Sequence, residues 1–198
     1  MKDNAESTRL PYGQGRQALV EAAVRLVARD GLTKLTYRSV TAEAGVSQGS
    51  LRHHFPNLLA LLEAALEWCV ELSQSYMSDL PRVEELLDHF TKMMDDNPDM
   101  PVFLTEVFVA SRNSPELGAV VRRNQDVYRA RVRTVLGKAG VADDVDELVD
   151  ALVALGDGMV YQRVVFGQEW SAVTDRQVAG ARRLLRQLAL SPAESTPA

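Results

Sequence analysis

The segment from Thr36 to Phe55 concentrates the side chains best suited to contact DNA; it reads TYRSVTAEAGVSQGSLRHHF. Gln48 can read an adenine edge, Ser50 can read either type of base pair, and Gly49 lets the backbone approach closely. Arg52 and the two histidines that follow it can bind phosphate oxygens. These residue types at this spacing predict a surface that enters a groove of double-stranded DNA.

Two short helices must position these side chains. Thr36 is a suitable cap for a helix over 37–44, which Gly45 ends, and Ser47 is a suitable cap for a helix over 48–54. The short turn and the two helix lengths are typical of a helix-turn-helix. The apolar positions that would lock the two helices together are Val40, Ala44, Val46 and Leu51. The alternative is a polar helical hairpin on the surface that binds nothing.

The rest of the chain also follows helical periodicity, and no alternating strands separated by hairpin turns are visible. The sequence therefore predicts an all-α fold of about nine helices. Its expected parts are a three-helix, helix-turn-helix head over 1–56, a helical body over 57–190 and a disordered tail over 191–198. Glycines, prolines and capping residues place the helices at about 15–30, 37–44, 48–54, 58–78, 82–96, 101–112, 115–138, 143–166 and 175–190.

Composition narrows the class of protein. The 198 residues are 46% hydrophobic and 25% charged, and the single cysteine, Cys69, excludes an intramolecular disulfide and a cysteine-rich metal site. The net charge of −5 argues against nucleic-acid binding, but eight of the basic and only five of the acidic residues fall within 1–56. A basic head could meet DNA phosphate, although random scatter is the alternative. We see no signal peptide and no membrane span, so we expect a cytoplasmic, nucleoid-associated protein without a membrane partner.

The N-terminal third resembles the tetracycline-repressor (TetR) family of transcriptional regulators, over about residues 14–62. Gln17 to Gly31 is similar to that family's first helix, with its alanine pair and closing glycine, and Thr36 to Ala44 is similar to its second. Gly45 to Leu62, GVSQGSLRHHFPNLLALL, is similar to the recognition helix, the following histidine–phenylalanine pair and the start of the fourth helix. The resemblance implies a homodimer on a palindromic operator, with a ligand in the body changing the spacing of the two heads.

Two positions depart from the family pattern. Arg52 stands where the family commonly has tyrosine, and Leu58 stands where it often has lysine. The second change removes a phosphate contact, so affinity would depend more on Arg16, Arg38 and Arg52. The residues expected at the DNA are Thr36, Tyr37, Arg38, Ser47, Gln48, Gly49, Ser50, Arg52, His53 and His54.

The stretch from Met100 to Ala110 is apolar nearly all round its helix, which predicts burial. A buried Glu106 would need a partner such as Arg122 or Arg129; alternatively it is a polar group inside an apolar cavity. Methionines and aromatic rings suit a small hydrophobic effector, aromatic or cationic. The residues expected to line such a cavity are Trp68, Met93, Met94, Phe103, Glu106, Phe108, Tyr128 and Tyr161.

The last two helices carry apolar stripes that a single chain could bury only in part, which predicts a four-helix bundle with a second copy. Packing within one chain is the alternative. The residues expected at the dimer interface are Leu152, Leu155, Met159, Ala181, Leu184 and Leu188. Asp157 lies between Gly156 and Gly158, and we favour an ion pair or an interface contact there over ligand binding.

Other functions find little support. His53 and His54 are adjacent on a helix and point apart, so they make a poor metal site, and Cys69 reads as a buried thiol. We find no nucleophile motif and no glycine-rich phosphate loop, so we expect neither enzymatic activity nor a cofactor. The sequence thus predicts a dimeric transcriptional repressor released by a small hydrophobic ligand. The alternatives are an architectural DNA-binding protein without an effector, and a helical enzyme or adaptor acting through its body.

Overall fold

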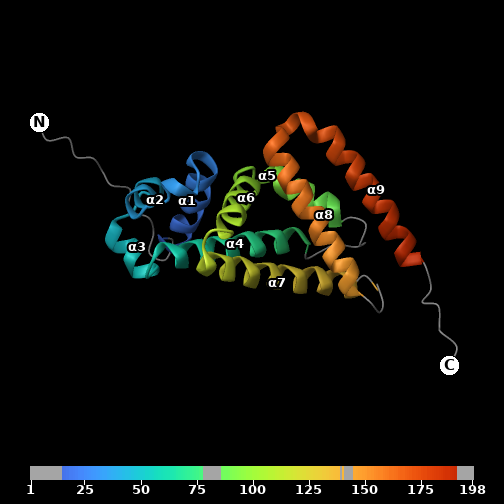
Figure 1. Cartoon of the computed structure of the whole chain (residues 1–198), viewed down its shortest axis with the longest axis horizontal. Coiled ribbons are helices and arrows are strands. Elements are labelled where there is room, and N and C mark those ends of the chain that lie inside the picture. The colour runs from blue at the N-terminus through green and yellow to red at the C-terminus, as the bar shows by residue number, and fades with distance from the viewer. Residues whose placement is uncertain (1–14, 78–85, 139, 141–144, 191–198) are drawn as a thin grey trace, which may run out of the picture.

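The computed structural model describes residues 15–77, 86–138, 140 and 145–190, and the expected tail over 191–198 lies outside these ranges. Within them the chain forms α-helices and two short 3₁₀ helices, η1 (Leu32–Lys34) and η3 (Gly167–Trp170), with no strand (Figure 1). The α-helices are α1 (Gly15–Asp30), α2 (Tyr37–Ala44), α3 (Gln48–His54), α4 (Leu58–Met77), α5 (Leu86–Asp96), α6 (Asp99–Ser111), α7 (Pro115–Lys138), α8 (Val145–Phe166) and α9 (Ser171–Leu190). The all-α prediction is confirmed.

Two helices begin earlier than the sequence predicted. Helix α6 begins at Asp99 rather than 101, because a proline such as Pro101 is tolerated in a first turn, where its missing N–H would have no helical partner. Helix α9 begins at Ser171 rather than 175, because η3 follows α8 through Gly167 and leads directly into it. The expected residues 82–85 of the fifth helix lie outside the described ranges.

Local hydrogen bonds explain why α2 and α3 form where they do. The Thr36 hydroxyl accepts a hydrogen bond from the Ser39 N–H at 3.1 Å, and the Ser39 hydroxyl accepts one from the Thr36 N–H at 2.9 Å, which is a reciprocal capping arrangement. Gly45 ends α2 in the left-handed conformation, with φ +66°. The Ser47 hydroxyl then accepts a hydrogen bond from the Ser50 N–H at 3.1 Å and caps α3. Both predicted caps and the predicted turn are confirmed.

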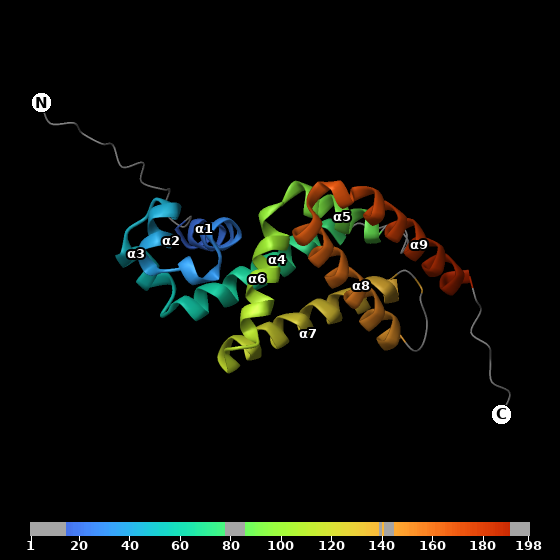
Figure 2. The ribbon, with the colours of Figure 1, turned by 45° about the horizontal axis from the view of Figure 1, so that its top comes forward.

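The head, α1 to α3, has its own apolar centre and also rests on the body, α4 to α9. Its fully buried side chains include Leu19, Val40 and Leu51, and Phe55 closes the end of α3 at 3% exposure. Helix α1 contacts both α4 and α6, so the head is held by two helices of the body. Figures 1 and 2 show α3 at one end of the molecule and α9 at the other.

The body is built around α7, which packs against α4, α6 and α8. Phe103, Leu66 and Leu136 are fully buried at its centre, and Met93 of α5 is 2% exposed. In the described part of the chain, no helix is both long enough and apolar enough to cross a membrane. The same helices that bury this core also enclose a cavity.

Candidate DNA-binding surface and ligand cavity

Helix α3 presents its polar side chains to solvent because one apolar side chain anchors it. Leu51 is fully buried against the head, whereas Gln48, Gly49, Arg52 and His53 are exposed. Ser50 is half-buried. The helix lies at the free end of the head (Figure 1), where a DNA groove can reach it.

Arg52 is oriented by an aromatic neighbour. Its guanidinium lies over the ring of Tyr37, with 5.7 Å between the guanidinium carbon and the ring centroid. Such a cation–π contact restrains a long side chain without neutralising it. The Tyr37 ring is half-buried and Arg38 beside it is exposed, so α2 and α3 together present two guanidinium groups.

The head's positive charge is distributed unevenly. Arg25 and Arg29 both bind Glu43, at 3.3 Å and 3.0 Å, and Arg29 also binds Asp30 at 3.0 Å. Within the described ranges Arg38 and Arg52 form no ion pair. The basic groups left to meet phosphate therefore include these two arginines, together with Arg16 of α1 and Lys34 of η1, which also form no ion pair among the described residues.

Two of the expected DNA contacts also have structural roles, and a third is half-buried. The hydroxyls of Thr36 and Ser47 cap helices, as described above. His54 is half-buried, and burial together with the charges of His53 and Arg16 lowers its pKa. At neutral pH its imidazole is therefore uncharged, and it can offer a phosphate a hydrogen bond but no charge.

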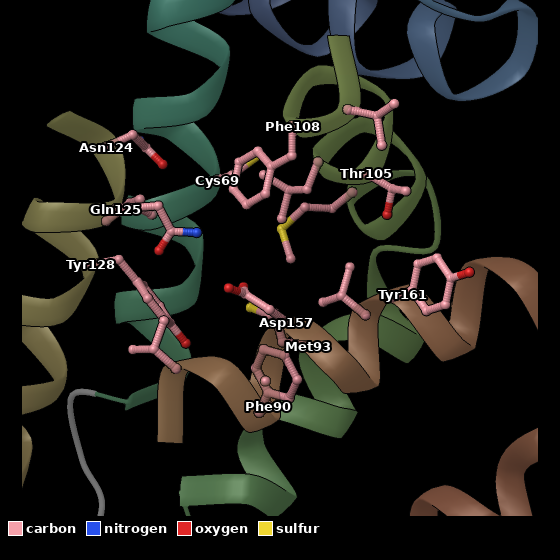
Figure 3. Close-up of a pocket in the computed structure, with 17 residues that line it drawn as sticks. Cys69, Phe90, Met93, Thr105, Phe108, Asn124, Gln125, Tyr128, Asp157 and Tyr161 are labelled. Atoms are coloured by element: carbon pink, nitrogen blue, oxygen red, sulfur yellow. The ribbon is translucent and has the colours of Figure 1, made fainter. Parts of the chain in front are cut away.

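A cavity of about 200 Å³ lies in the body, between α4, α5, α6, α7 and α8 (Figure 3). Its walls are mainly apolar, with rings and methionines from α5, α6, α7 and α8. Polar groups enter it from α6, α7 and α8. The lining residues are Cys69, Val70, Phe90, Met93, Met100, Leu104, Thr105, Phe108, Val109, Asn124, Gln125, Tyr128, Val153, Gly156, Asp157, Val160 and Tyr161.

The sequence anticipated part of this lining. Four of the predicted residues border the cavity, namely Met93, Phe108, Tyr128 and Tyr161. The other four do not border it, namely Trp68, Met94, Phe103 and Glu106. Met94 and Phe103 are packed into the core at 2% and 0% exposure, and Trp68 packs against the core at its edge. Apolar character alone could not separate core residues from cavity residues.

The prediction that Glu106 is buried is wrong. Its side chain is exposed, and its carboxylate accepts a hydrogen bond from the backbone N–H of Leu32 at 3.3 Å. Neither expected arginine partner binds it, since Arg129 donates instead to Asp150 at 2.9 Å and no ion pair joins Arg122 to Glu106 in the described chain. Helix α6 packs against the head, and Glu106 lies at that junction.

Asp157 is the carboxylate that the cavity contains. Burial raises its pKa, against the opposing effects of a hydrogen bond from the Gln125 side chain and of the charge of Arg129. Figure 3 shows the Gln125 side chain of α7 directed toward the Asp157 carboxylate of α8. Gly156 beside it faces α5, and a Cβ there would make an ordinary van der Waals contact with the Phe90 ring at 3.6 Å.

Most of the side chains expected at a dimer interface are turned into the body. Met159 and Ala181 are buried within one chain, at 1% and 8% exposure, because their stripe faces the core. Leu155 packs partly against that core, and Leu152 borders a small second cavity beside Tyr76. The side chains of Leu184 and Leu188 lie outside the described part of the structure.

A different face of α8 is open. Its side chains recur at alternating spacings of three and four residues, and a Cβ added to the glycine among them would meet nothing within 4 Å. The stripe, called here the open stripe, consists of Ala151, Ala154, Gly158, Tyr161 and Val165. Tyr161 is 56% and Val165 is 50% exposed, so the open stripe presents apolar surface to solvent.

The described residues offer no group of three or more His, Cys, Asp or Glu side chains that could hold a metal ion. Cys69 is 2% exposed, and burial raises the pKa of its thiol far above the usual range. A thiol in this environment stays protonated and is a poor nucleophile.

Both the N-terminal and the C-terminal part of the chain match known protein families. Residues 19–65 match the family described as "Bacterial regulatory proteins, tetR family", and residues 81–190 match "Tetracyclin repressor-like, C-terminal domain". The HTH-type transcriptional regulator CymR of Pseudomonas putida is 28% identical over 160 residues, which cover 75% of this chain and 77% of that protein.

Solved structures agree. A TetR-family regulator from Rhodococcus sp. superposes with a TM-score of 0.76 at 19% identity, covering 87% of this chain and 98% of that one. The multidrug binding protein EbrR, solved with imidazole, gives a TM-score of 0.65 at 27% identity, covering 91% and 93%. With a helix-turn-helix at one end, a cavity in the body and family matches over both, the chain belongs to the TetR family of bacterial transcriptional regulators.

Proposed function

We propose that this regulator is a homodimeric repressor that leaves a palindromic operator when a small organic molecule fills the body cavity. The observation that carries the proposal is that a single helix, α6, lines the cavity and also contacts the head. Leu104, Thr105 and Phe108 of α6 line the cavity, and Glu106 of the same helix binds the head at Leu32. A ligand that shifts α6 therefore acts on the head directly.

Helix α4 offers another route from the cavity to the head, because Cys69 and Val70 line the cavity and α4 follows the head just after Phe55. In the structure α6 also contacts α1 and η1, so the head over 1–56 and the body over 57–190 share a second junction. A ligand changes operator affinity only to the extent that it prefers one head position over another.

The proposed dimer uses the open stripe of α8. Alanine and glycine along it allow a second helix to approach closely, and a two-fold axis would place two such stripes together. The two α3 helices would then read half-sites one DNA turn apart, about 34–36 Å. Gln48 and Ser50 are proposed to read bases, with Arg38 and Arg52 on phosphates.

The effector proposed is small and hydrophobic, because the cavity walls are mainly apolar. EbrR, whose chain is 27% identical, is described as a multidrug binding protein, which supports an organic ligand here. The matched proteins named above are regulators, so an enzyme acting through the body has less support. We place the protein's action on chromosomal DNA in the cytoplasm.

The operator is the object to find first. We would incubate the full-length protein with fragmented genomic DNA, sequence the retained fragments and measure affinity for the recovered palindrome by fluorescence anisotropy. Gln48→Ala should relax preference at one base pair of each half-site, at a cost of ~1–3 kcal/mol. An unchanged preference at every position would remove the base-reading role, and retention of DNA without any common sequence would favour the architectural alternative.

A further inference from the structure

We propose that the body cavity is selective for organic cations, namely molecules with an aromatic body and a protonated amine or quaternary ammonium group whose counter-ion is Asp157. The inference rests on the proposed function, because it takes the cavity as the effector site, and it adds the chemical class of the effector. Four observations support it.

The first is the unpaired charge of Asp157. No ion pair to this carboxylate exists among the described residues, and the arginine whose charge influences it, Arg129, already donates to Asp150 at 2.9 Å. Asp157 is exposed at the cavity wall, so a ligand can reach it, and a ligand that displaces the surrounding water must offer the carboxylate another partner. A bound cation would supply that partner.

The second is a buried acceptor beside it. The Gln125 side chain donates a hydrogen bond to Asp157, which directs its amide nitrogen there and leaves the amide oxygen. That Oε1 is buried and has no hydrogen-bond partner in the described part of the molecule. This oxygen lies beneath the cavity surface, so it adds negative potential beside Asp157 rather than a direct contact, and both groups favour a cation.

The third is the absence of positive charge from the described lining, which contains no Lys, Arg or His. An anionic ligand would face Asp157 without a compensating cation. A neutral ligand would leave the negative charge of Asp157 uncompensated. The electrostatics of the cavity therefore separate the three charge classes in the order cation, neutral molecule, anion.

The fourth is the chemistry of the other lining residues. Phe90 and Phe108 present rings, and Met93 and Met100 present flexible thioethers. Rings attract cations through their faces, and methionine adapts to aromatic ligands of different outline. Val109 and Tyr161, which are 68% and 56% exposed, mark the side of the cavity open to solvent.

The test uses three compounds with the same phenylethyl body and different charge: phenethylamine, 2-phenylethanol and 3-phenylpropionate. We would titrate each into the full-length protein by calorimetry at about pH 8, where the amine is still mainly protonated. The amine should bind most tightly. Asp157→Asn should weaken the amine by about 10- to 100-fold and change the alcohol little. Asp146→Asn, the same exchange at a position of α8 that does not line the cavity, should alter neither.

The order of the three affinities for the wild-type protein tests the proposed selectivity for cations even if Asp157→Asn folds poorly. Equal or tighter binding of the alcohol or the propionate would overturn the proposal, as would an amine that does not bind at all or that binds the folded Asp157→Asn variant equally well. These titrations contain no DNA. An amine that binds through Asp157 but leaves operator affinity unchanged would support the ligand class and count against the release mechanism.

Discussion

Glu106 and Leu32 are 74 positions apart in the chain, yet the Glu106 Oε2 atom accepts a hydrogen bond from the Leu32 backbone nitrogen at 3.3 Å. Gly31, just before, has φ +83°, and a Cβ there would lie 3.6 Å from the same oxygen. The left-handed backbone at Gly31 turns the chain so that the amide of Leu32 faces α6. This contact ties the start of η1 in the head to a helix that lines the cavity.

Removing this carboxylate should loosen the head locally. In Glu106→Ala the Leu32 amide loses its acceptor, and we expect its hydrogen exchange to accelerate by about 2- to 10-fold, since a hydrogen bond of this kind is worth ~0.5–1.5 kcal/mol. Exchange measured by mass spectrometry over residues 31–35 tests this. Glu106→Gln, which keeps an acceptor oxygen, should retain most of the protection. Equal exchange in all three proteins would show that the contact does not hold the head.

Arg52→Ala should weaken binding to specific and nonspecific DNA alike, because a phosphate contact carries no sequence information. The slope of log affinity against log salt concentration should become shallower by about one unit. Arg29→Ala is the matched control, since Arg29 already binds Glu43 and Asp30. If both substitutions change the salt slope by the same amount, the assignment of free charge to α2 and α3 is incorrect.

Gly45→Ala should destabilise the head. Gly45 has φ +66°, and an alanine in the left-handed conformation costs about 1–2 kcal/mol. Gly137→Ala, in the last turns of α7 where a Cβ meets nothing within 4 Å, should be neutral or stabilising by up to ~1 kcal/mol. Urea unfolding of both variants measures the contrast. Equal stability of the two would mean that the turn relaxes to accept a side chain.

Val165→Glu should yield monomers, because the open stripe would bring two copies of the new charge into one interface. An uncompensated buried charge costs about 3–5 kcal/mol, or more than 100-fold in the dissociation constant. Operator affinity should fall with it, since one head contacts half a site. Sedimentation velocity gives the oligomeric state.

Leu152→Glu is the informative comparison, because Leu152 borders an interior cavity rather than the open stripe. It should lower the melting temperature instead of producing folded monomers. Folded monomers from Leu152→Glu, with an intact dimer for Val165→Glu, would restore the interface that the sequence predicted.

Asp157→Asn should change how stability depends on pH. Since burial raises the folded-state pKa of Asp157, the native protein binds this proton more tightly than the unfolded chain does. Stability from this group therefore falls as pH rises from the unfolded pKa through the raised folded pKa, and it stays lower above that window. The free energy of unfolding of Asp157→Asn should therefore rise relative to that of the wild type as pH increases through this window. Urea unfolding at several pH values without ligand measures the difference. Parallel profiles would contradict a raised pKa of this carboxylate.

The sequence by itself determined the caps and the turn of the head and most of the helix bounds, because the signals that set them act over three or four residues. Thr36, Gly45 and Ser47 form their caps and turn with their immediate neighbours. The buried anchor Leu51 and the exposed donors of α3 follow from the same local periodicity. Longer-range packing was not needed to predict that surface.

Only the tertiary structure decided which carboxylate faces the cavity. Glu106 lies in a helix that is apolar nearly all round, so periodicity indicates no preferred direction for it, and packing of α1 against α6 left Glu106 at the head. Asp157 lies in a helix with two apolar faces, one turned to the core and one left open. Periodicity shows which faces of a helix are apolar, but the partner of each face comes from segments far away in the chain, and so the cavity, the head junction and the open stripe appear only when those segments pack together.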